Sequence, residues 1–271
     1  MGPLSLGLAS PEEATLAGLL RALPGPPAAF EAAWREVSDP SALLDLAQAH
    51  GVQGPILAAA GACTPSLALR AARTRAEARL RHSWTRAALD EASEALHSAG
   101  LLHAVLKGPL LAEELYADPG QRVSQDLDLL VLPGDLARGI AALEEVGYLA
   151  EEGPHADYAR QHHVHLQLAK SDRPLVELHF RAFRGFGLEL SAGPLLARSR
   201  PGPGPARVLS HEDRALYLAL HAAGHLFERL GWLFDLKLLL TRAAEGAFPL
   251  DLERVLAMAE RLGASAPLAL T

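Results

Sequence analysis

Residues 102–131 read LHAVLKGPLLAEELYADPGQRVSQDLDLLV, and an acidic pair, Asp126 and Asp128, stands near the end of this stretch. Successive side chains of a β-strand point to opposite faces of a sheet, so the two aspartates would share one face. The other face would be apolar, formed by Leu127, Leu129 and Val131. Two carboxylates side by side on a half-buried strand repel each other, and a divalent cation with oxygen ligands relieves that repulsion. The stretch therefore predicts a strand that carries a metal site.

Two later segments, residues 163–168 and 175–180, show the same alternation of polar and apolar side chains. The short turn at 171–174 between them predicts an antiparallel hairpin. Each strand would bury an apolar face against helices and present a polar face to a cleft. The polar faces would carry His163, His165, Gln167, Glu177 and His179. With the aspartate strand, these segments predict a small mixed sheet with helices on one side.

Helical patterns fill most of the remaining chain. We expect helices at 10–23, 28–37, 40–50, 66–99, 109–116, 133–146, 212–227, 231–244 and 251–262, and a short strand at 101–107. Residues 201–205, PGPGP, are typical of a linker. The predicted fold is α+β, in three parts: a helical N-terminal subdomain (1–99), an α/β core with the mixed sheet (100–200) and a helical C-terminal subdomain (201–271).

Composition excludes several classes of protein. The formal net charge of -7 gives no electrostatic basis for general nucleic-acid binding. Only one cysteine, Cys63, is present, so no intramolecular disulfide forms, which fits a reducing compartment. The N-terminus does not have the pattern of a signal peptide, and no apolar run is long enough to span a membrane. We therefore expect a cytoplasmic protein without membrane contact.

One series of motifs runs through the centre of the chain as LKG, LYADPGQR, DLDLLV and VELHF. Over about residues 95–240 this series resembles the uncharacterised nucleotidyltransferase family, within the DNA polymerase β-like nucleotidyltransferase superfamily. The residues that carry the resemblance are Lys107, Gly108, Tyr116, Asp118, Pro119, Gly120, Arg122, Asp126, Asp128, His165, Glu177 and His179. Residues 100–200 would accordingly form a nucleotidyltransferase-like core.

The resemblance implies a reaction and a set of catalytic residues. Asp126, Asp128 and Glu177 would be catalytic and would hold Mg²⁺ or Mn²⁺, since two such ions can clamp the attacking and leaving oxygens of an in-line displacement. A hydroxyl of an unknown small-molecule or protein acceptor would attack the α-phosphate of a nucleoside triphosphate such as ATP, releasing pyrophosphate. Glu177 or a histidine would take the proton of that hydroxyl.

The resemblance also implies how the nucleoside triphosphate, the donor substrate, is bound. Lys107 and Arg122 would neutralise its charge, with Gly108 and His179 beside them. The superfamily commonly has Gly-Ser at the end of the first strand, where this chain has Gly108-Pro109. Proline offers neither an N–H nor a hydroxyl. Triphosphate binding would therefore depend more on Lys107 and Arg122.

Two other functions fit the same residues. A binding module that keeps the fold but has lost turnover would fit Pro109, whereas an intact third carboxylate beside the aspartate pair would favour an enzyme. A metal-dependent phosphohydrolase would use the histidine-rich face, and histidines at metal-bonding distance would favour it. Arg122 could also form a structural ion pair with Asp118 or Asp126.

His221 and His225 lie four residues apart, hence on one face of a helix. They lack the glutamate of an HExxH site, so a zinc protease is a poor interpretation. The pattern Trp232-Leu233-Phe234-Asp235 follows them. This region would either place His225, Arg229 or Asp235 at the acceptor end of the cleft or tie the C-terminal helices together.

Overall fold

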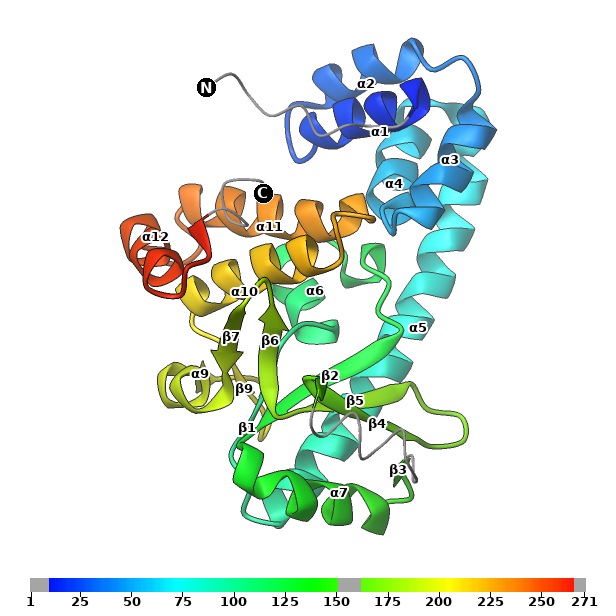
Figure 1. Ribbon diagram of the computed structural model, residues 1–271. Helices are drawn as coiled ribbons and strands as arrows, with labels where there is room; N and C mark the ends of the chain where they lie inside the picture. Colours follow the sequence, from blue (N-terminus) through cyan, green and yellow to red (C-terminus); the bar gives the residue numbers. More distant parts are fainter. Residues whose placement is uncertain (1–9, 151–161, 266–271) are drawn as a thin grey trace.

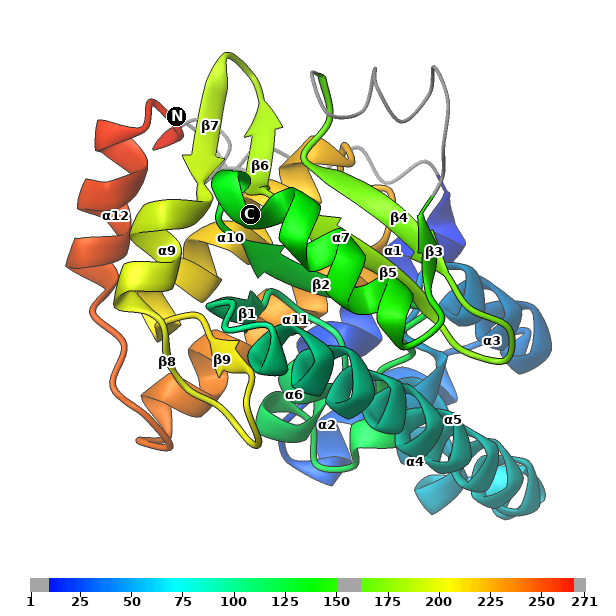
Figure 2. The same cartoon turned by 90° about the horizontal axis from the view of Figure 1, so that it is seen from below.

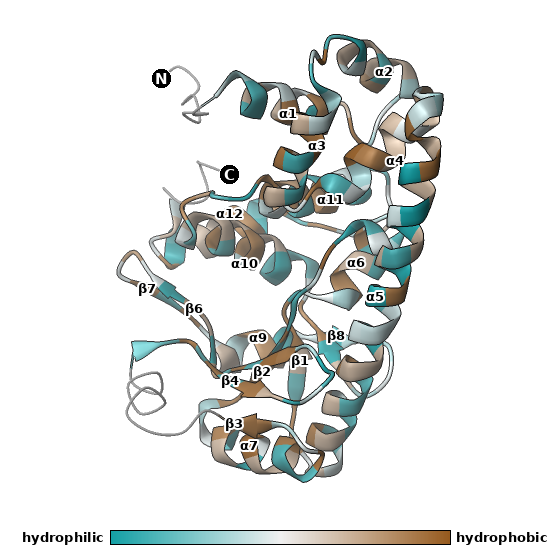
Figure 3. Ribbon diagram, turned by 90° about the vertical axis from the view of Figure 1, so that its right-hand side faces the viewer, coloured by the Kyte–Doolittle hydropathy of each residue, from teal (hydrophilic) through white to brown (hydrophobic). Residues whose placement is uncertain are grey.

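The computed structural model describes residues 10–150 and 162–265 (Figure 1). The first part of the chain is helical: α1 (Pro11–Arg21), α2 (Pro27–Arg35), α3 (Pro40–Ala49), α4 (Gln53–Cys63) and α5 (Pro65–Ser98). The long helix α5 is continuous and runs along one side of the molecule, from the N-terminal helices to the sheet (Figure 3). None of the helices in the described ranges combines the length and apolar character that a membrane crossing requires.

The centre is a mixed sheet with the strand order β3-β4-β5-β2-β1-β9-β8. In it β2 pairs parallel with β5 and antiparallel with β1, β4 pairs antiparallel with β5, and β9 lies parallel to β1. The strands are β1 (His103–Val105), β2 (Asp126–Val131), β3 (Leu149–Ala150), β4 (His165–Ala169), β5 (Leu175–His179), β8 (Arg200–Pro201) and β9 (Arg207–Val208). The predicted α+β fold with a mixed sheet and a hairpin after the aspartate strand is confirmed.

The apolar face of the sheet packs against α5 and α7 (Leu136–Glu145), as the alternation predicted. Leu127 and Leu129 of β2 are fully buried there together with side chains of both helices. The polar face of the sheet lies below α10 (His211–Gly224) and α11 (Leu230–Ala244) in Figure 1. Figure 2 shows α5 and α7 from their own side. Helices thus lie on both sides of the sheet, so the prediction of helices on one side was wrong. Alternation within a strand predicts which face is apolar but says nothing about what covers the polar face.

Short elements connect this framework: α6 (Pro109–Leu115), the 3-10 turns η1 (Pro119–Gln121) and η2 (Pro133–Asp135), and α12 (Leu252–Arg261). Helix ends follow their sequence signals. Ser10 and Glu13 form a capping box at α1, and the Ser210 hydroxyl accepts the Asp213 N–H at the start of α10. Gly147 ends α7 at a φ of 90°, where glycine avoids strain.

Several elements were not predicted: α4, the hairpin of β6 (Arg181–Gly185) and β7 (Leu188–Ser191), and α9 (Ala192–Arg198). The linker-like residues 201–205 lie in the hairpin of β8 and β9. Interpreting them as a linker was wrong, because β9 pairs with β1 and thereby joins the sheet. The boundaries of the three predicted parts remain predictions.

Glycines allow η1 to lie between α4 and α5. A Cβ on Gly120 would stand 2.9 Å from the backbone nitrogen of Arg79 in α5. A Cβ on Gly54 of α4 would clash with the carbonyl oxygen of Gln121. Backbone atoms of a helix cannot move aside as a flexible side chain can. Gly120 of the Asp-Pro-Gly motif therefore lets η1 pack directly against α5, which fixes the position of the segment that leads into β2.

Glu114 of α6 joins the helix to β8 and α10 through charged contacts. Its carboxylate lies 2.7 Å from Arg200 Nη2 and 3.0 Å from His211 Nε2, and it also pairs with Arg214, whose side chain is only 2% exposed. Burial alone would raise the pKa of Glu114, but His211, Arg214 and Arg200 hold it well below its ordinary range. Removing one member leaves a buried charge without compensation, which is strongly destabilising.

The packing at η1 predicts that Gly120→Ala lowers the free energy of unfolding by about 1–3 kcal/mol, because the added methyl group overpacks the α5 backbone. Gly134→Ala is the matched control, since a Cβ there meets nothing within 4 Å. Chemical denaturation of both variants measures the difference. Equal stability of the two would show that α5 and η1 do not pack this closely in solution.

The Glu114 network predicts a pH-dependent effect. At neutral pH, Glu114→Gln should cost about 3–5 kcal/mol of unfolding free energy, because Arg214 loses its buried counter-charge. A carboxyl whose pKa is lowered on folding stabilises the protein above its unfolded pKa, near 4.5, and this contribution fades as the pH falls below that value. The difference from wild type should therefore shrink in acid.

Glu113→Gln is the control for the same helix, because the side chain of its partner Arg86 is 23% exposed, whereas that of Arg214 is 2% exposed. Such a pair contributes about 0–1 kcal/mol. Denaturant titrations between pH 3 and 7 provide the comparison. A pH-independent difference between Glu114→Gln and wild type would contradict the ionic role of Glu114.

Candidate active site

The pairing of β2 with β5 brings the acidic and histidine residues together. In this parallel register Asp128 lies directly beside Glu177, and Asp126 lies two residues earlier on the same face of β2. His179 follows Glu177 by two residues, and the β4–β5 register places His165 beside His179. One face of the sheet thus carries three acids and two histidines from three adjacent strands.

The acids are close enough to share a cation. Carboxylate oxygens of Asp126, Asp128 and Glu177 all lie within 4.8 Å of one another. The Asp128 side chain is only 1% exposed, and within the described ranges its Oδ2 has no hydrogen-bond partner. A buried carboxylate oxygen without a partner is costly. Hard divalent cations take oxygen ligands, so these three residues fit such an ion and remain its predicted ligands.

Lys107, just beyond β1, neutralises part of this negative charge. Its Nζ lies 3.2 Å from Asp128 Oδ1, and its side chain is 13% exposed. Burial alone would lower the pKa of Lys107, but Asp128 and Asp126 raise it above the ordinary value. The lysine is therefore positively charged and stands at the carboxylates, where it was predicted to meet the charge of a triphosphate.

The two aspartates differ in acidity. Burial and the neighbouring Asp128 raise the pKa of Asp126. Burial would also raise the pKa of Asp128, but Lys107 and the His179 hydrogen bond hold it well below its usual range. Asp128 is thus firmly ionised, whereas Asp126 gains a proton more readily. An added cation would favour the ionised form of both residues.

His179 is buried between carboxylates. Its Nε2 lies 3.2 Å from Asp128 Oδ1 and 3.5 Å from Glu177 Oε2, while its Nδ1 lies 3.3 Å from the carbonyl oxygen of Arg181. Burial lowers the pKa of His179, but its bonds to Asp128 and Glu177 outweigh this effect and raise it. Burial would raise the pKa of Glu177, but His179 lowers it. Both acids beside His179 are therefore ionised.

Arg122 makes a different contact from those considered in the sequence. It forms a bidentate ion pair with Asp235 of α11, with Nε 3.0 Å from Oδ1 and Nη2 2.9 Å from Oδ2, whereas Asp118 pairs with Arg79. The Tyr116 hydroxyl donates to the same Asp235 carboxylate at 2.7 Å. Asp235 thus ties α11 to the segment before β2. A contact of Arg122 with a triphosphate stays a prediction.

Gly108 and Pro109 form the turn from β1 into α6. Gly108 has a φ of 80°, a backbone conformation that favours glycine, which explains its place at the strand end. Its carbonyl oxygen lies 3.4 Å from Arg122 Nη1. Pro109 is the first residue of α6, where a missing N–H costs little. This turn joins Lys107 to the segment that carries Arg122.

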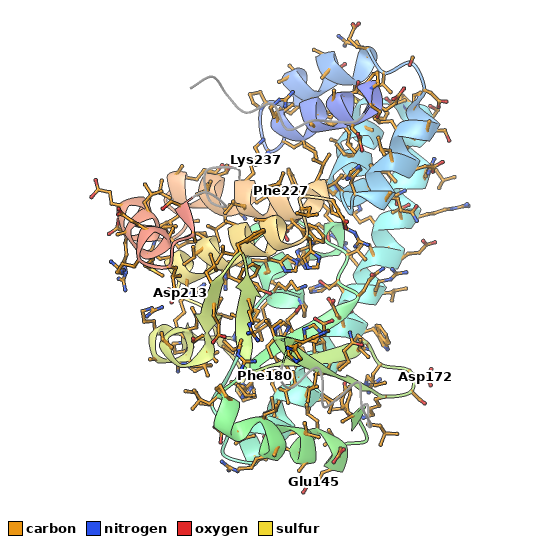
Figure 4. All side chains as sticks on the ribbon, in the orientation of Figure 1. Glu145, Asp172, Phe180, Asp213, Phe227 and Lys237 are labelled. Carbon is orange, nitrogen blue, oxygen red and sulfur yellow. The ribbon has the colours of Figure 1, made fainter. Side chains whose placement is uncertain are left out.

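Rings of α10 and α11 gather opposite the carboxylates. Ring centroids lie 4.7 Å apart for His221 and His225, 4.7 Å for His225 and Trp232, and 5.2 Å for His221 and Trp232. Burial and the charge of Lys107 keep the pKa of His221 well below its ordinary value. In Figure 4, labels mark Phe180, which follows His179, and Phe227, in the turn after α10. His221 is thus near enough to feel the charges of Lys107 and Asp128, while Asp235 ties helices together.

Tyr217 of α10 was missed in the sequence. It is fully buried, and burial together with Asp128 and Glu177 raises its pKa well above the ordinary value. A tyrosine in the middle of an apolar helix gives no sequence signal of such a neighbourhood. The pairing of Asp235 with Arg122 was missed as well, because 113 residues separate them.

A family model and a solved structure are similar to this chain. No curated protein matches the chain. Among solved structures, the solution structure of the antibiotic-resistance factor ANT(2'')-Ia is similar, with a TM-score of 0.45, 15% sequence identity, and coverage of 66% of this chain and 92% of that one. The family model described as uncharacterised nucleotidyltransferase matches residues 36–271. The chain therefore belongs to the uncharacterised nucleotidyltransferase family, as its central motifs predicted.

Proposed function

We propose that the protein transfers a nucleoside monophosphate from a nucleoside triphosphate to a hydroxyl of a small molecule or a protein. The observation that carries this proposal is the set of three carboxylates, Asp126, Asp128 and Glu177, with oxygens within 4.8 Å of one another on adjacent parallel strands. Membership of a nucleotidyltransferase family supports the class of reaction. The intact third carboxylate favours an enzyme over a binding module that has lost turnover.

In the proposed reaction the acceptor oxygen forms a bond to the α-phosphorus, and the bond from that phosphorus to the bridging oxygen breaks. Pyrophosphate leaves with the electron pair of that bond. Mg²⁺ or Mn²⁺ held by the three carboxylates would stabilise the charge on the attacking and leaving oxygens. The acceptor proton would pass to Glu177, because it is ionised and 15% exposed, whereas the raised pKa of His179 makes that ring a poorer base.

Lys107 has the position to meet the triphosphate. In the structure it offsets Asp128, with which it makes a contact of 3.2 Å. A divalent cation at the carboxylates would take over that compensation, so the lysine could turn to a phosphate oxygen as a compact point charge. Arg122 would mainly hold the segment before β2 in place through Asp235 and would reach the phosphates only after rearrangement.

The proposal predicts metal-dependent nucleotide binding. Each of the four ribonucleoside triphosphates is added with and without Mg²⁺ or Mn²⁺, and the melting temperature is measured. At a concentration 100 times Kd, a ligand stabilises the folded state by about 2.7 kcal/mol. We expect such a rise with at least one triphosphate, only in the presence of metal, and its loss in Asp126→Asn and Asp128→Asn.

Each variant is compared with its own nucleotide-free state, because Asp128→Asn alone leaves Lys107 without its nearest anion. Asp90→Asn is the matched control, since Asp90 lies on α5 with 53% of its side chain exposed. It should behave as wild type. If no triphosphate raises the melting temperature in the presence of either metal, donor binding, and with it the proposed reaction, is wrong.

A metal-dependent phosphohydrolase is a second candidate, favoured by one observation. His165, Glu177 and His179 offer ligand atoms within 4.8 Å of one another, so histidines lie where a metal could be bound. The products separate the two functions. A hydrolase would release free nucleoside monophosphate or phosphate without any acceptor. A transferase would attach the monophosphate to an acceptor.

A further inference from the structure

Beside the carboxylates lies a second set of donor atoms, which combines Glu177 with two histidine nitrogens that the proposed reaction leaves unused. His165 Nε2 lies 3.6 Å from Glu177 Oε1, and His179 Nε2 lies 3.5 Å from Glu177 Oε2. The two imidazole rings are cross-strand neighbours of β4 and β5, with centroids 4.8 Å apart. These ligand atoms all lie within 4.8 Å of one another. Two nitrogens and a carboxylate oxygen thus converge on one point.

The hydrogen bonds of His179 orient its ring as a ligand. Its Nδ1 lies 3.3 Å from the Arg181 carbonyl oxygen, to which only an N–H can donate. The Nε2 then faces Asp128 and Glu177, at 3.2 and 3.5 Å. A lone pair on Nε2 would repel these oxygens, so a positive centre, either a proton or a metal ion, must stand between them. An N–H donated to a carbonyl is the usual arrangement of a metal-binding histidine.

A further atom points to a cation at this place. Asp128 Oδ2 has no hydrogen-bond partner within residues 10–150 and 162–265, although the Asp128 side chain is only 1% exposed. The His165 and Glu177 side chains are still 23% and 15% exposed, so an ion can enter from solvent.

From this geometry we infer that His165, Glu177 and His179 bind a divalent transition-metal ion, Mn²⁺, Co²⁺ or Zn²⁺, beside the carboxylate site of Asp126 and Asp128. Imidazole nitrogens suit these ions, whereas Mg²⁺ prefers oxygen ligands throughout. Glu177 would belong to both positions. The inference deepens the proposed function by naming the metal class of that site, but ion binding can be measured without nucleotide or turnover.

The test uses the full-length, metal-stripped protein and Mn²⁺ alone. Titration followed by electron paramagnetic resonance gives the affinity, and spin-echo modulation detects ¹⁴N nuclei bound to the ion. We expect nitrogen modulation in wild type and an affinity at least about tenfold weaker in His165→Ala, by analogy with the 10–100-fold losses seen around metal sites. Because His165 is partly exposed, the variant should fold, and its circular dichroism checks this.

His97→Ala is the matched control, because it removes an exposed imidazole from α5 and should leave both readouts unchanged. His165→Gln, which keeps the bulk of the side chain, should weaken binding as His165→Ala does. Bound Mn²⁺ without nitrogen modulation, or an unchanged affinity in both His165 variants, would overturn the inference.

Asp126→Asn separates this inference from the proposed function. Asp126 belongs to the carboxylate set but not to the histidine set, so its variant should keep the nitrogen modulation while losing the triphosphate-dependent stabilisation. Nitrogen-bound Mn²⁺ in wild type without any stabilisation by triphosphates would overturn the proposed function and leave the metal site. Stabilisation by triphosphates, with Mn²⁺ that shows no nitrogen modulation, would overturn the histidine metal site and leave the proposed function.

Discussion

Repulsion among the carboxylates of Asp126, Asp128 and Glu177 is the constraint on which the site depends. The parallel register of β2 and β5 forces Asp128 and Glu177 to be neighbours, and the pleat places Asp126 on the same face. Such a group of acids, partly buried, is stable only with positive charge beside it. Lys107 and His179 supply that charge, both at 3.2 Å from Asp128. A divalent cation bound at the carboxylates could replace the positive charge of Lys107 or of His179.

The surrounding helices hold this arrangement through charges of their own. Asp235 of α11 pairs with Arg122 before β2, and Glu114 of α6 pairs with Arg214 of α10. Both pairs link the C-terminal helices to segments that flank Lys107 and Asp126. Asp235 and Arg214 are buried, so each pair costs desolvation that only good geometry offsets. Their contribution is therefore to fix where α10 and α11 lie above the carboxylates, which positions the His221 and Trp232 rings.

The sequence predicted those features whose cause lies within one strand or one turn. The i, i+2 alternation at Asp126 and at Glu177 predicted the faces of β2 and β5, and the short turn at 171–174 predicted the hairpin of β4 and β5. Alternation cannot tell which strands become neighbours, so the pairing of Asp128 with Glu177 came from the family resemblance alone. The Arg122–Asp235 pair could not be predicted either, because its partners are far apart in sequence.

Sheet register also explains why one glutamate could serve two kinds of ligand set. Glu177 of β5 lies between Asp128 of β2 and Gln167 of β4. Two residues further along β5, His179 is the cross-strand neighbour of His165. Oxygen donors thus lie towards β2 and nitrogen donors towards β4, with Glu177 between them. Hard divalent ions prefer the oxygen donors, and softer ones prefer the imidazole nitrogens. The choice of metal would then follow from the strand order β4-β5-β2, before any substrate binds.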